Sequence, residues 1–207
     1  MNTFKDKGIK NVYAYEARAE QGGYVNGVMA AMLSKSGVIG PIETGDAKLY
    51  VDGFKAGAKA AKPNIKILVN WTGFFSDVSL ASEAANTEIA AGADALTGTA
   101  QMVVGAIGVA KQKGIPWFGT QSSQTSLAPS IVVANQVYDW TVALKPMVEN
   151  IKKGKLGGEA YSLTLKNGGL TIEYNPKYNL PPEVKKAAEK AIEDIKAGKI
   201  KIEVGGK

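Results

Sequence analysis

The chain has 207 residues, of which 45% are hydrophobic, and a net charge of +6, as expected for one large or two small globular domains. Histidine and cysteine are both absent, which excludes disulfides, thiolate zinc sites, cysteine nucleophiles and Ser-His-Asp triads. No apolar stretch approaches the roughly 20 residues that a membrane-spanning helix needs, and the polar residues 1–6 predict no signal peptide in this chain.

Short apolar runs alternate with helix-like stretches along the chain. The apolar runs predict strands over residues 11–15, 38–42, 65–69, 94–96, 115–118 and 131–134. Apolar residues at helical spacing, bounded by glycine or proline, predict helices over residues 17–35, 50–61, 77–92, 99–114, 138–153 and 181–198. Asp77 or Ser76 is predicted to cap the third of these helices, and Thr99 the fourth.

The segment near the carboxyl terminus has a different pattern. Residues 161–165 alternate like a half-buried strand, and the turn sequence KNGG follows at residues 166–169. A second short strand is predicted over residues 170–173. Together these features predict a small hairpin.

Strands that alternate with helices form parallel sheets covered by helices on both faces. We therefore predict an α/β fold in which residues 17–136 form a complete doubly wound lobe. Residues 1–16 and 137–207 do not provide a full sheet of their own. The pattern leaves two interpretations of them open, either part of a second lobe or additions packed around a single sheet.

Polar and aromatic residues follow the predicted strands, at the sheet edge where open parallel sheets bind ligands. Carboxamides offer both a donor and an acceptor, and aromatic rings offer flat apolar faces. This combination suits a planar heterocycle. The predicted ligand-binding residues are Trp71, Asn70, Phe75, Thr99, Gln101, Gln121, Gln124 and Asn135.

Among these residues, Trp71 is predicted to be the stacking platform for the ligand, because it lies where a strand leaves the sheet. Gln101 and Gln121 follow the next two strands and are expected to reach the edge of the same ring. Trp117 lies inside a predicted strand and is interpreted as a core residue.

Enzymatic and nucleic-acid-binding functions find less support in the sequence. Residues 40–45 have the glycine spacing of a P-loop, but Asp46-Ala47 stands where Lys-Ser/Thr is required. No GxGxxG follows the first strand, and no cluster of metal ligands is evident. The lysines of residues 185–201 alternate with acidic residues, which is typical of a solvated helix face. We expect no cofactor, no metal and no nucleic acid partner.

Several segments resemble a known family in collinear order over nearly the whole chain. They are GFKAGAKA (53–60), PNIK (63–66), VNWTG (69–73), GAD (92–94), GAIGVAKQKG (105–114), LAP (127–129) and YNPKYNLPPEV (174–184). They resemble the basic membrane protein family of ABC-transporter substrate-binding lipoproteins, which includes a purine nucleoside receptor. The resemblance implies a type I periplasmic-binding-protein-like fold, here with one complete lobe and part of a second.

The chain departs from the family pattern in two respects. The family's amino-terminal third, with its signal peptide, lipid-bearing cysteine and a ligand-contacting motif, has no counterpart here. In addition, the family sequence GVDSDQ corresponds to GTQSSQ at residues 119–124. Gln121 and Ser123 thus replace two aspartates that would bind a ribose, so a free base becomes as good a candidate as a nucleoside.

We therefore predict a solute-binding module of an ABC transporter that binds a purine-like ligand without chemistry and delivers it to a permease. The resemblance implies an extracytoplasmic, membrane-associated location. The alternatives are a cytoplasmic nucleotide-handling enzyme of doubly wound fold and a remnant that has lost ligand binding. A partial lobe would leave sheet edges uncovered, so we also expect a homo-oligomer that buries residues 1–16 and 160–173.

Overall fold

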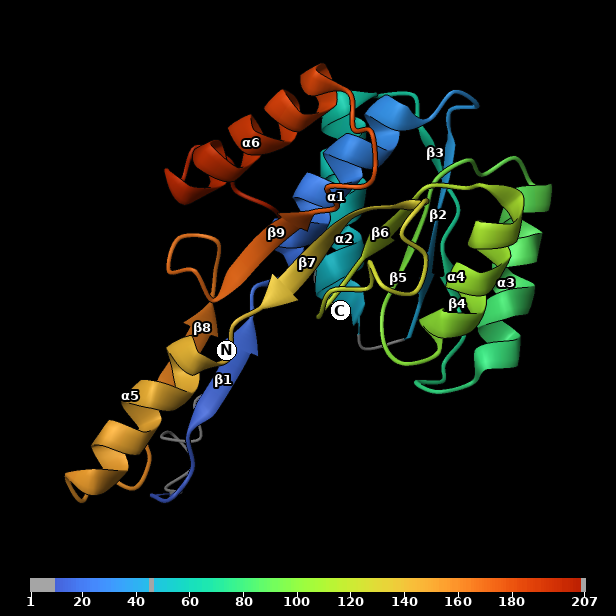
Figure 1. Ribbon diagram of the computed structural model, residues 1–207. Coiled ribbons are helices and arrows are strands. Elements are labelled where there is room, and N and C mark those ends of the chain that lie inside the picture. The colour runs from blue at the N-terminus through green and yellow to red at the C-terminus, as the bar shows by residue number, and fades with distance from the viewer. Residues whose placement is uncertain (1–9, 45–46, 206–207) are drawn as a thin grey trace.

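The computed structural model describes residues 10–44 and 47–205 (Figure 1). The strands are β1 (Ala14–Ala17), β2 (Val38–Glu43), β3 (Lys66–Ile67), β4 (Asn70–Trp71), β5 (Leu96–Gly98), β6 (Trp117–Gly119), β7 (Val132–Tyr138), β8 (Ala160–Leu163) and β9 (Leu170–Tyr174). The helices are α1 (Ala19–Leu33), α2 (Lys48–Ala61), α3 (Val78–Ala90), α4 (Val103–Lys113), α5 (Thr141–Lys152) and α6 (Pro182–Lys196). Among these helices, none combines the length and the apolarity that crossing a bilayer requires.

Most of the strands belong to one sheet of seven strands. Its order is β3-β2-β5-β6-β7-β9, and β4 pairs with β2 beyond the end of β3. All pairs are parallel except β7–β9. The predicted α/β class with a parallel sheet is confirmed. The strand predicted over residues 65–69 is interrupted, because β3 and β4 pair with successive parts of β2.

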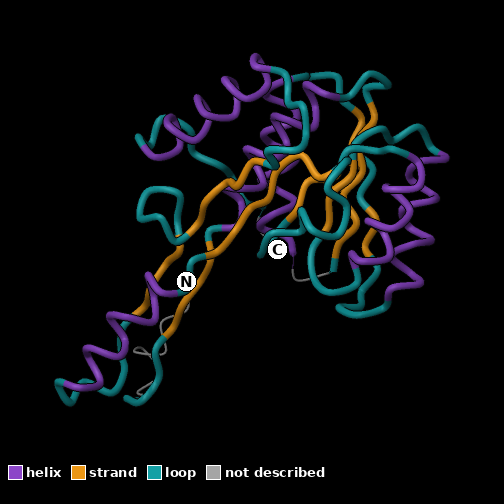
Figure 2. Tube along the Cα trace, in the orientation of Figure 1, coloured by secondary structure: helices purple, strands orange, loops and turns teal. Residues whose placement is uncertain are grey.

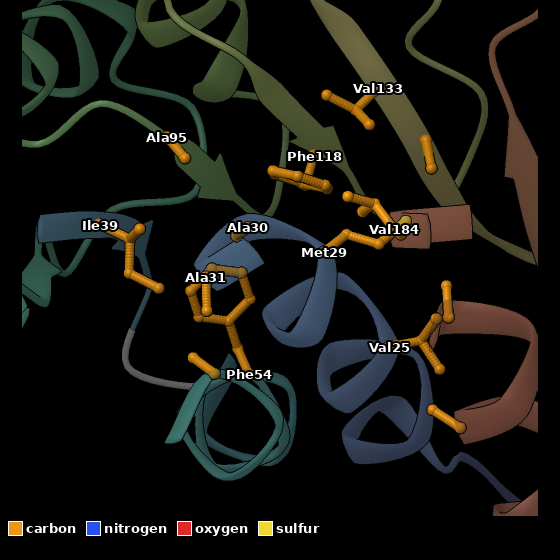
Figure 3. Packing of buried hydrophobic residues seen from close by; sticks show 14 of the residues in the cluster. Val25, Met29, Ala30, Ala31, Ile39, Phe54, Ala95, Phe118, Val133 and Val184 are labelled. Atoms are coloured by element: carbon orange, nitrogen blue, oxygen red, sulfur yellow. The ribbon is translucent and has the colours of Figure 1, made fainter. Parts of the chain in front are cut away.

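Helices cover both faces of this sheet, with α1, α2 and α6 on one face and α3 and α4 on the other (Figure 1). Figure 3 shows part of the first core cluster, in which Met29 of α1 lies near Phe118 of the sheet and Val184 of α6. The second cluster is built around Trp117, which is fully buried. The prediction that Trp117 is a core residue is confirmed.

On the face of the large sheet that α1, α2 and α6 cover, the backbones of α1 and α2 lie unusually close together. A Cβ atom placed on Gly57 of α2 would lie 1.9 Å from the backbone oxygen of Tyr24 in α1. A Cβ atom on Gly27 of α1 would lie 2.1 Å from the backbone oxygen of Phe54 in α2. The two helix backbones can therefore approach this closely only because these positions carry no side chain.

A second, smaller sheet stands apart from the first and contains β1 and β8 in parallel (Figures 1 and 2). The hairpin predicted over residues 161–173 is therefore wrong, since β8 pairs with β1 whereas β9 pairs antiparallel with β7. The turn itself is real, because the carboxamide oxygen of Asn167 accepts from the backbone N–H groups of Thr164 and Gly169. Instead of folding the two strands onto each other, it passes the chain from one sheet to the other.

The junction between the two sheets contains a group of aromatic rings. The ring of Trp140 contacts those of Tyr15 and Tyr138 edge to face, at centroid distances of 5.4 and 5.5 Å. Tyr15 belongs to β1 and Tyr138 ends β7, so these contacts link the small sheet to the large one.

The division into lobes stays a proposal. Residues 14–17 and 160–163, with α5 beside them, form a unit that is separate from the large sheet, as the partial second lobe requires. However, β9 and α6, which lie beyond residue 136, join the large sheet and its core. We propose that the complete lobe includes them.

Association of this chain with itself also stays a prediction. Leu144, Val148 and Ile151 lie on one face of α5 and are each about half exposed, at 52%, 49% and 49%. An exposed apolar face next to a two-stranded parallel sheet favours association. We expect a dimer or a larger oligomer in light scattering across a dilution series. A monomer at high micromolar concentration would contradict this prediction.

Glu88 of α3 is buried against the sheet, where a Cβ atom on Gly40 would meet its carboxylate. Burial is the main cause that raises its pKa from 4.5 to about 9, the charge of Glu43 adds to this rise, and the backbone N–H of Asn70 opposes it. The folded state therefore holds a proton that the unfolded chain releases above its ordinary pKa. The contribution of Glu88 to stability is fully present below about pH 4.5 and is lost as the pH rises toward 9.

We expect the melting temperature of the wild-type chain to fall between about pH 5 and pH 9, by roughly 2–4 °C for each kcal/mol lost. The fall should be shallower in Glu88→Gln, which cannot ionise. Glu83→Gln, on the exposed side of the same helix, is the matched control and should follow the wild type. Equal slopes for Glu88→Gln and the wild type would contradict the prediction.

Candidate functional site

A cavity of about 190 Å³ opens where the carboxyl ends of the central strands meet the end of the small sheet. Thr44 follows β2, Thr99 follows β5, Gln121 follows β6 and Tyr138 ends β7. The lining residues are Ala17, Ala19, Thr44, Ala47, Leu49, Tyr50, Phe75, Thr99, Ala100, Gln121 and Tyr138. The side chains that line it are hydroxyls, an amide, aromatic rings and small apolar groups, and none of them is a charged type.

Two residues of the cavity wall have a backbone conformation that side chains rarely adopt. Ala100 and Gln121 lie in the left-handed region, with φ of 67° and 69°. Among the residues that the structure describes, Ala100 and Gln121 are the two non-glycine residues with positive φ. Such conformations cost free energy and concentrate at functional sites. Their position directly after β5 and β6 supports the cavity as the candidate site.

The side wall formed by Tyr50 is fixed by a buried chain of hydrogen bonds. Thr97 Oγ1 donates to the backbone oxygen of Phe118 at 2.8 Å, so Tyr50 Oη is the donor in its 2.7 Å contact with Thr97 Oγ1. Asn26 Nδ2 in turn donates to Tyr50 Oη at 3.0 Å. Burial raises the pKa of Tyr50 above its usual range, which keeps the phenol in this donating form.

A buried carboxyl group, that of Glu43, lies behind Thr99 and outside the lining of the cavity. Glu43 ends β2 next to Thr99, because Ile42 and Gly98 are paired in the adjacent strands. The distance between Thr99 Oγ1 and Glu43 Oε2 is 2.5 Å, and Glu43 is fully buried. Burial raises the pKa of Glu43 well above its ordinary value, against the lowering effect of the Thr99 hydrogen bonds. The neutral acid is therefore the favoured form.

The predicted cap roles have different outcomes. The carboxylate of Asp77 accepts from the backbone N–H of Leu80 at 3.0 Å, which confirms it as the cap of α3. Thr99 does not cap α4, since Met102 occupies that position and the Thr99 hydroxyl contacts Glu43. The loop after β5 is longer than predicted, and this leaves Thr99 at the cavity.

The predicted ligand-binding residues lie in more than one place. Phe75, Thr99 and Gln121 line the cavity. Gln101 and Gln124 line a neighbouring hollow, which Gln121 also borders. The ligand-binding role of all these residues stays a prediction.

Trp71 and Asn70 line a third hollow, between β4 and α3. Trp71 is 45% exposed, so it is not a core residue, and it lies apart from the residues that line the cavity. Phe75, which is 53% exposed, is the aromatic residue that the structure brings to the cavity from this segment.

Gln124 and Asn135 are buried and engaged in structural contacts. Trp117 Nε1 donates to Gln124 Oε1 at 2.7 Å. Asn135 Oδ1 accepts from the backbone N–H of Gln124 at 3.0 Å, and its Nδ2 donates to Thr125 Oγ1 at 2.9 Å. These bonds hold the loop after β6 in place, which positions Gln121.

Sequence reasoning missed Thr44, Tyr50 and Tyr138 as cavity residues. Thr44 follows a predicted strand and carried the same signal as the residues that were chosen. Tyr138 was assigned to a helix, although β7 extends to it. Tyr50 reaches the cavity from a helix, so the pattern of strand ends could not indicate it. In the part of the chain that the structure describes, no group of three or more metal-ligating side chains occurs.

The chain matches a known protein family over nearly its whole length. The family model described as "ABC transporter substrate-binding protein PnrA-like", Bmp, matches residues 1–204. The chain belongs to this family. The resemblance to basic membrane proteins is thereby confirmed.

Individual relatives extend this finding. A purine-binding protein of Brucella abortus is 29% identical over 94% of this chain and 55% of the relative. An ABC transporter nucleoside-binding protein, BmpA of Lactococcus lactis, is 27% identical over 95% of this chain and 61% of the relative. The chain thus spans little more than half the length of these curated relatives.

The fold has a solved counterpart in a solute-binding protein of an ABC transporter system from Conexibacter woesei. The TM-score is 0.78 at 21% identity, with 99% of this chain and 69% of that chain covered. The predicted type I periplasmic-binding-protein-like fold is confirmed.

Proposed function

We propose that this chain is a solute-binding module of an ABC transporter that binds a purine base or nucleoside in the cavity, without chemical conversion. The observation that carries the proposal is the cavity itself, where Phe75 lies with the hydroxyl of Thr99 and the amide of Gln121 at the carboxyl ends of parallel strands. The lining residues that the structure describes are uncharged, which favours a neutral ligand, because a charged group would lose its hydration without gaining a partner among them. Two relatives are a purine-binding protein and a nucleoside-binding protein, which supports the purine class.

A free base is supported at least as well as a nucleoside. Of the two residues that replace the family's aspartates, Gln121 lines the cavity. Ser123 instead donates to Glu173 Oε1 at 2.5 Å. Neither replacement supplies the carboxylate that accepts hydrogen bonds from two ribose hydroxyls.

Family membership also supports the rest of the proposal. A substrate-binding protein of this family would deliver its ligand to an ABC permease from outside the cytoplasm. The purine-binding and nucleoside-binding relatives are longer than this chain, which covers 55% and 61% of them.

A thermal-shift screen tests the proposal. Purine bases and purine nucleosides should raise the melting temperature, and pyrimidine bases and ribose serve as matched control compounds. Stabilisation by nucleoside triphosphates alone would favour the nucleotide-handling enzyme. Stabilisation by no compound would favour the remnant that has lost ligand binding.

A further inference from the structure

One residue of the cavity wall, Thr99, faces two different groups. Its side chain lines the cavity, and its hydroxyl is also 2.5 Å from Glu43 Oε2. Glu43 is fully buried, and its second oxygen, Oε1, has no hydrogen-bond partner among the described residues. In the described part of the chain, the polar contacts of the Glu43 side chain are therefore made by Thr99, through its hydroxyl and its backbone N–H.

The surroundings of Glu43 favour its neutral form. Among the described residues, the titratable groups that interact with its charge are Tyr50 of α2, Tyr138 of β7 and Glu88 of α3. Burial raises the pKa of each of these groups too. In the described residues, no salt bridge includes Glu43. A proton on Glu43 thus removes a charge that no cation balances.

The protonation state of Glu43 decides what Thr99 offers to the cavity. A hydroxyl has one hydrogen to donate and two lone pairs to accept with. When Glu43 carries its acid hydrogen on Oε2, the oxygen in contact with Thr99, it donates that hydrogen to Thr99 Oγ1, and the threonine keeps its own hydrogen for the cavity. When Glu43 is ionised, Thr99 Oγ1 donates its hydrogen to the carboxylate. Thr99 can then only accept a hydrogen bond from a ligand in the cavity.

We propose that Glu43 is a positioning residue that holds Thr99 as a hydrogen-bond donor toward the ligand. The inference rests on the proposed function, since it concerns a ligand in the same cavity. It assigns a chemical requirement to that ligand, namely an acceptor such as an unprotonated ring nitrogen or a carbonyl oxygen opposite Thr99. A ligand that presents an N–H group there is disfavoured while Glu43 keeps its proton.

Calorimetric titration with adenine, hypoxanthine, adenosine and inosine tests the donor. Thr99→Val keeps the shape of the side chain and removes the hydroxyl, so affinity should fall by about two- to tenfold. The matched control is Thr120→Val, because Thr120 is a buried threonine after the neighbouring strand whose hydroxyl donates to the backbone oxygen of Gly98. The inference is overturned if the two variants bind the same probe equally well.

The pH dependence tests the part played by Glu43. Wild-type affinity should decrease as the pH rises through the pKa of Glu43, because ionisation removes the donor. Glu43→Gln cannot ionise, so its affinity should not decrease over the same range. Since Glu88 titrates at about 9, the series is repeated in Glu88→Gln, which should keep the wild-type decrease. A profile shared by the wild type and Glu43→Gln would overturn the inference.

Infrared spectroscopy separates this inference from the proposed function, because it needs no ligand. The difference spectrum between the wild type and Glu43→Gln near neutral pH should contain the carbonyl band of a protonated carboxylic acid. That band should shift in Thr99→Val. Absence of the band overturns the inference, whereas failure of every probe to bind the wild type, with the band present, contradicts the proposed function.

Discussion

Replacing Gly57 with alanine should destabilise the chain by about 3 kcal/mol, near the upper end of the usual cost of overpacking. The added Cβ would lie 1.9 Å from the backbone oxygen of Tyr24. A backbone atom cannot rotate away as the end of a side chain can, so α1 and α2 must separate. This separation would loosen the core that both helices share with the sheet. The urea midpoint measures the loss.

Gly108→Ala is the matched control for this substitution. Gly108 lies within α4, and a Cβ atom there would meet no heavy atom within 4 Å. Alanine is a better helix former than glycine, so this variant should gain about 0.5–1 kcal/mol. A Gly57→Ala variant as stable as the wild type would show that the two helices are not packed as closely as described.

Replacing Phe75 with alanine should weaken binding of a purine ligand by roughly ten- to a hundredfold, since stacking on a base is worth about 1–3 kcal/mol. Phe75 is 53% exposed and lines the cavity, so its removal should change stability little. Phe75→Tyr keeps an aromatic face and should retain most of the affinity. Calorimetric titration with adenine and adenosine, together with the urea midpoint, measures both effects.

Trp71→Ala is the companion variant, because Trp71 is similarly exposed but lines a different hollow. A larger loss of affinity in Trp71→Ala than in Phe75→Ala would restore the sequence-based prediction that Trp71 is the stacking platform. It would also show that the ligand lies nearer α3 than the cavity does.

Local patterns in the sequence predicted the alternating elements well but not every pairing. Apolar runs and helix-ending glycines are local features of the sequence. They therefore predict the approximate bounds of β2, β6 and the helices. The hairpin failed because the turn at Asn167 is local while its flanking strands have distant partners: Ala160 pairs with Ala14, and Leu170 pairs with Tyr138.

The candidate site was predicted in outline for a similar reason. The carboxyl ends of parallel strands must meet at one edge, so Thr99 and Gln121 could be located from strand order. The direction of a side chain could not be predicted from strand order. That direction distinguishes Gln121, which lines the cavity, from Gln124, which accepts a hydrogen bond from Trp117 Nε1. The contact between Glu43 and Thr99 could not be predicted, because it depends on the pairing of β2 with β5.

The pairing of β1 with β8 has a consequence for the order in which the chain acquires its structure. Ala14 and Ala160 are partners in this parallel pair, so the small sheet closes a loop that contains most of the protein. Contacts so far apart in sequence form slowly, because the entropy of closing the loop is lost before any contact compensates for it. During synthesis, β1 therefore leaves the ribosome long before its partner exists. The segment from α1 to β7 can assemble in the meantime, and the small sheet is among the last parts of the molecule to form.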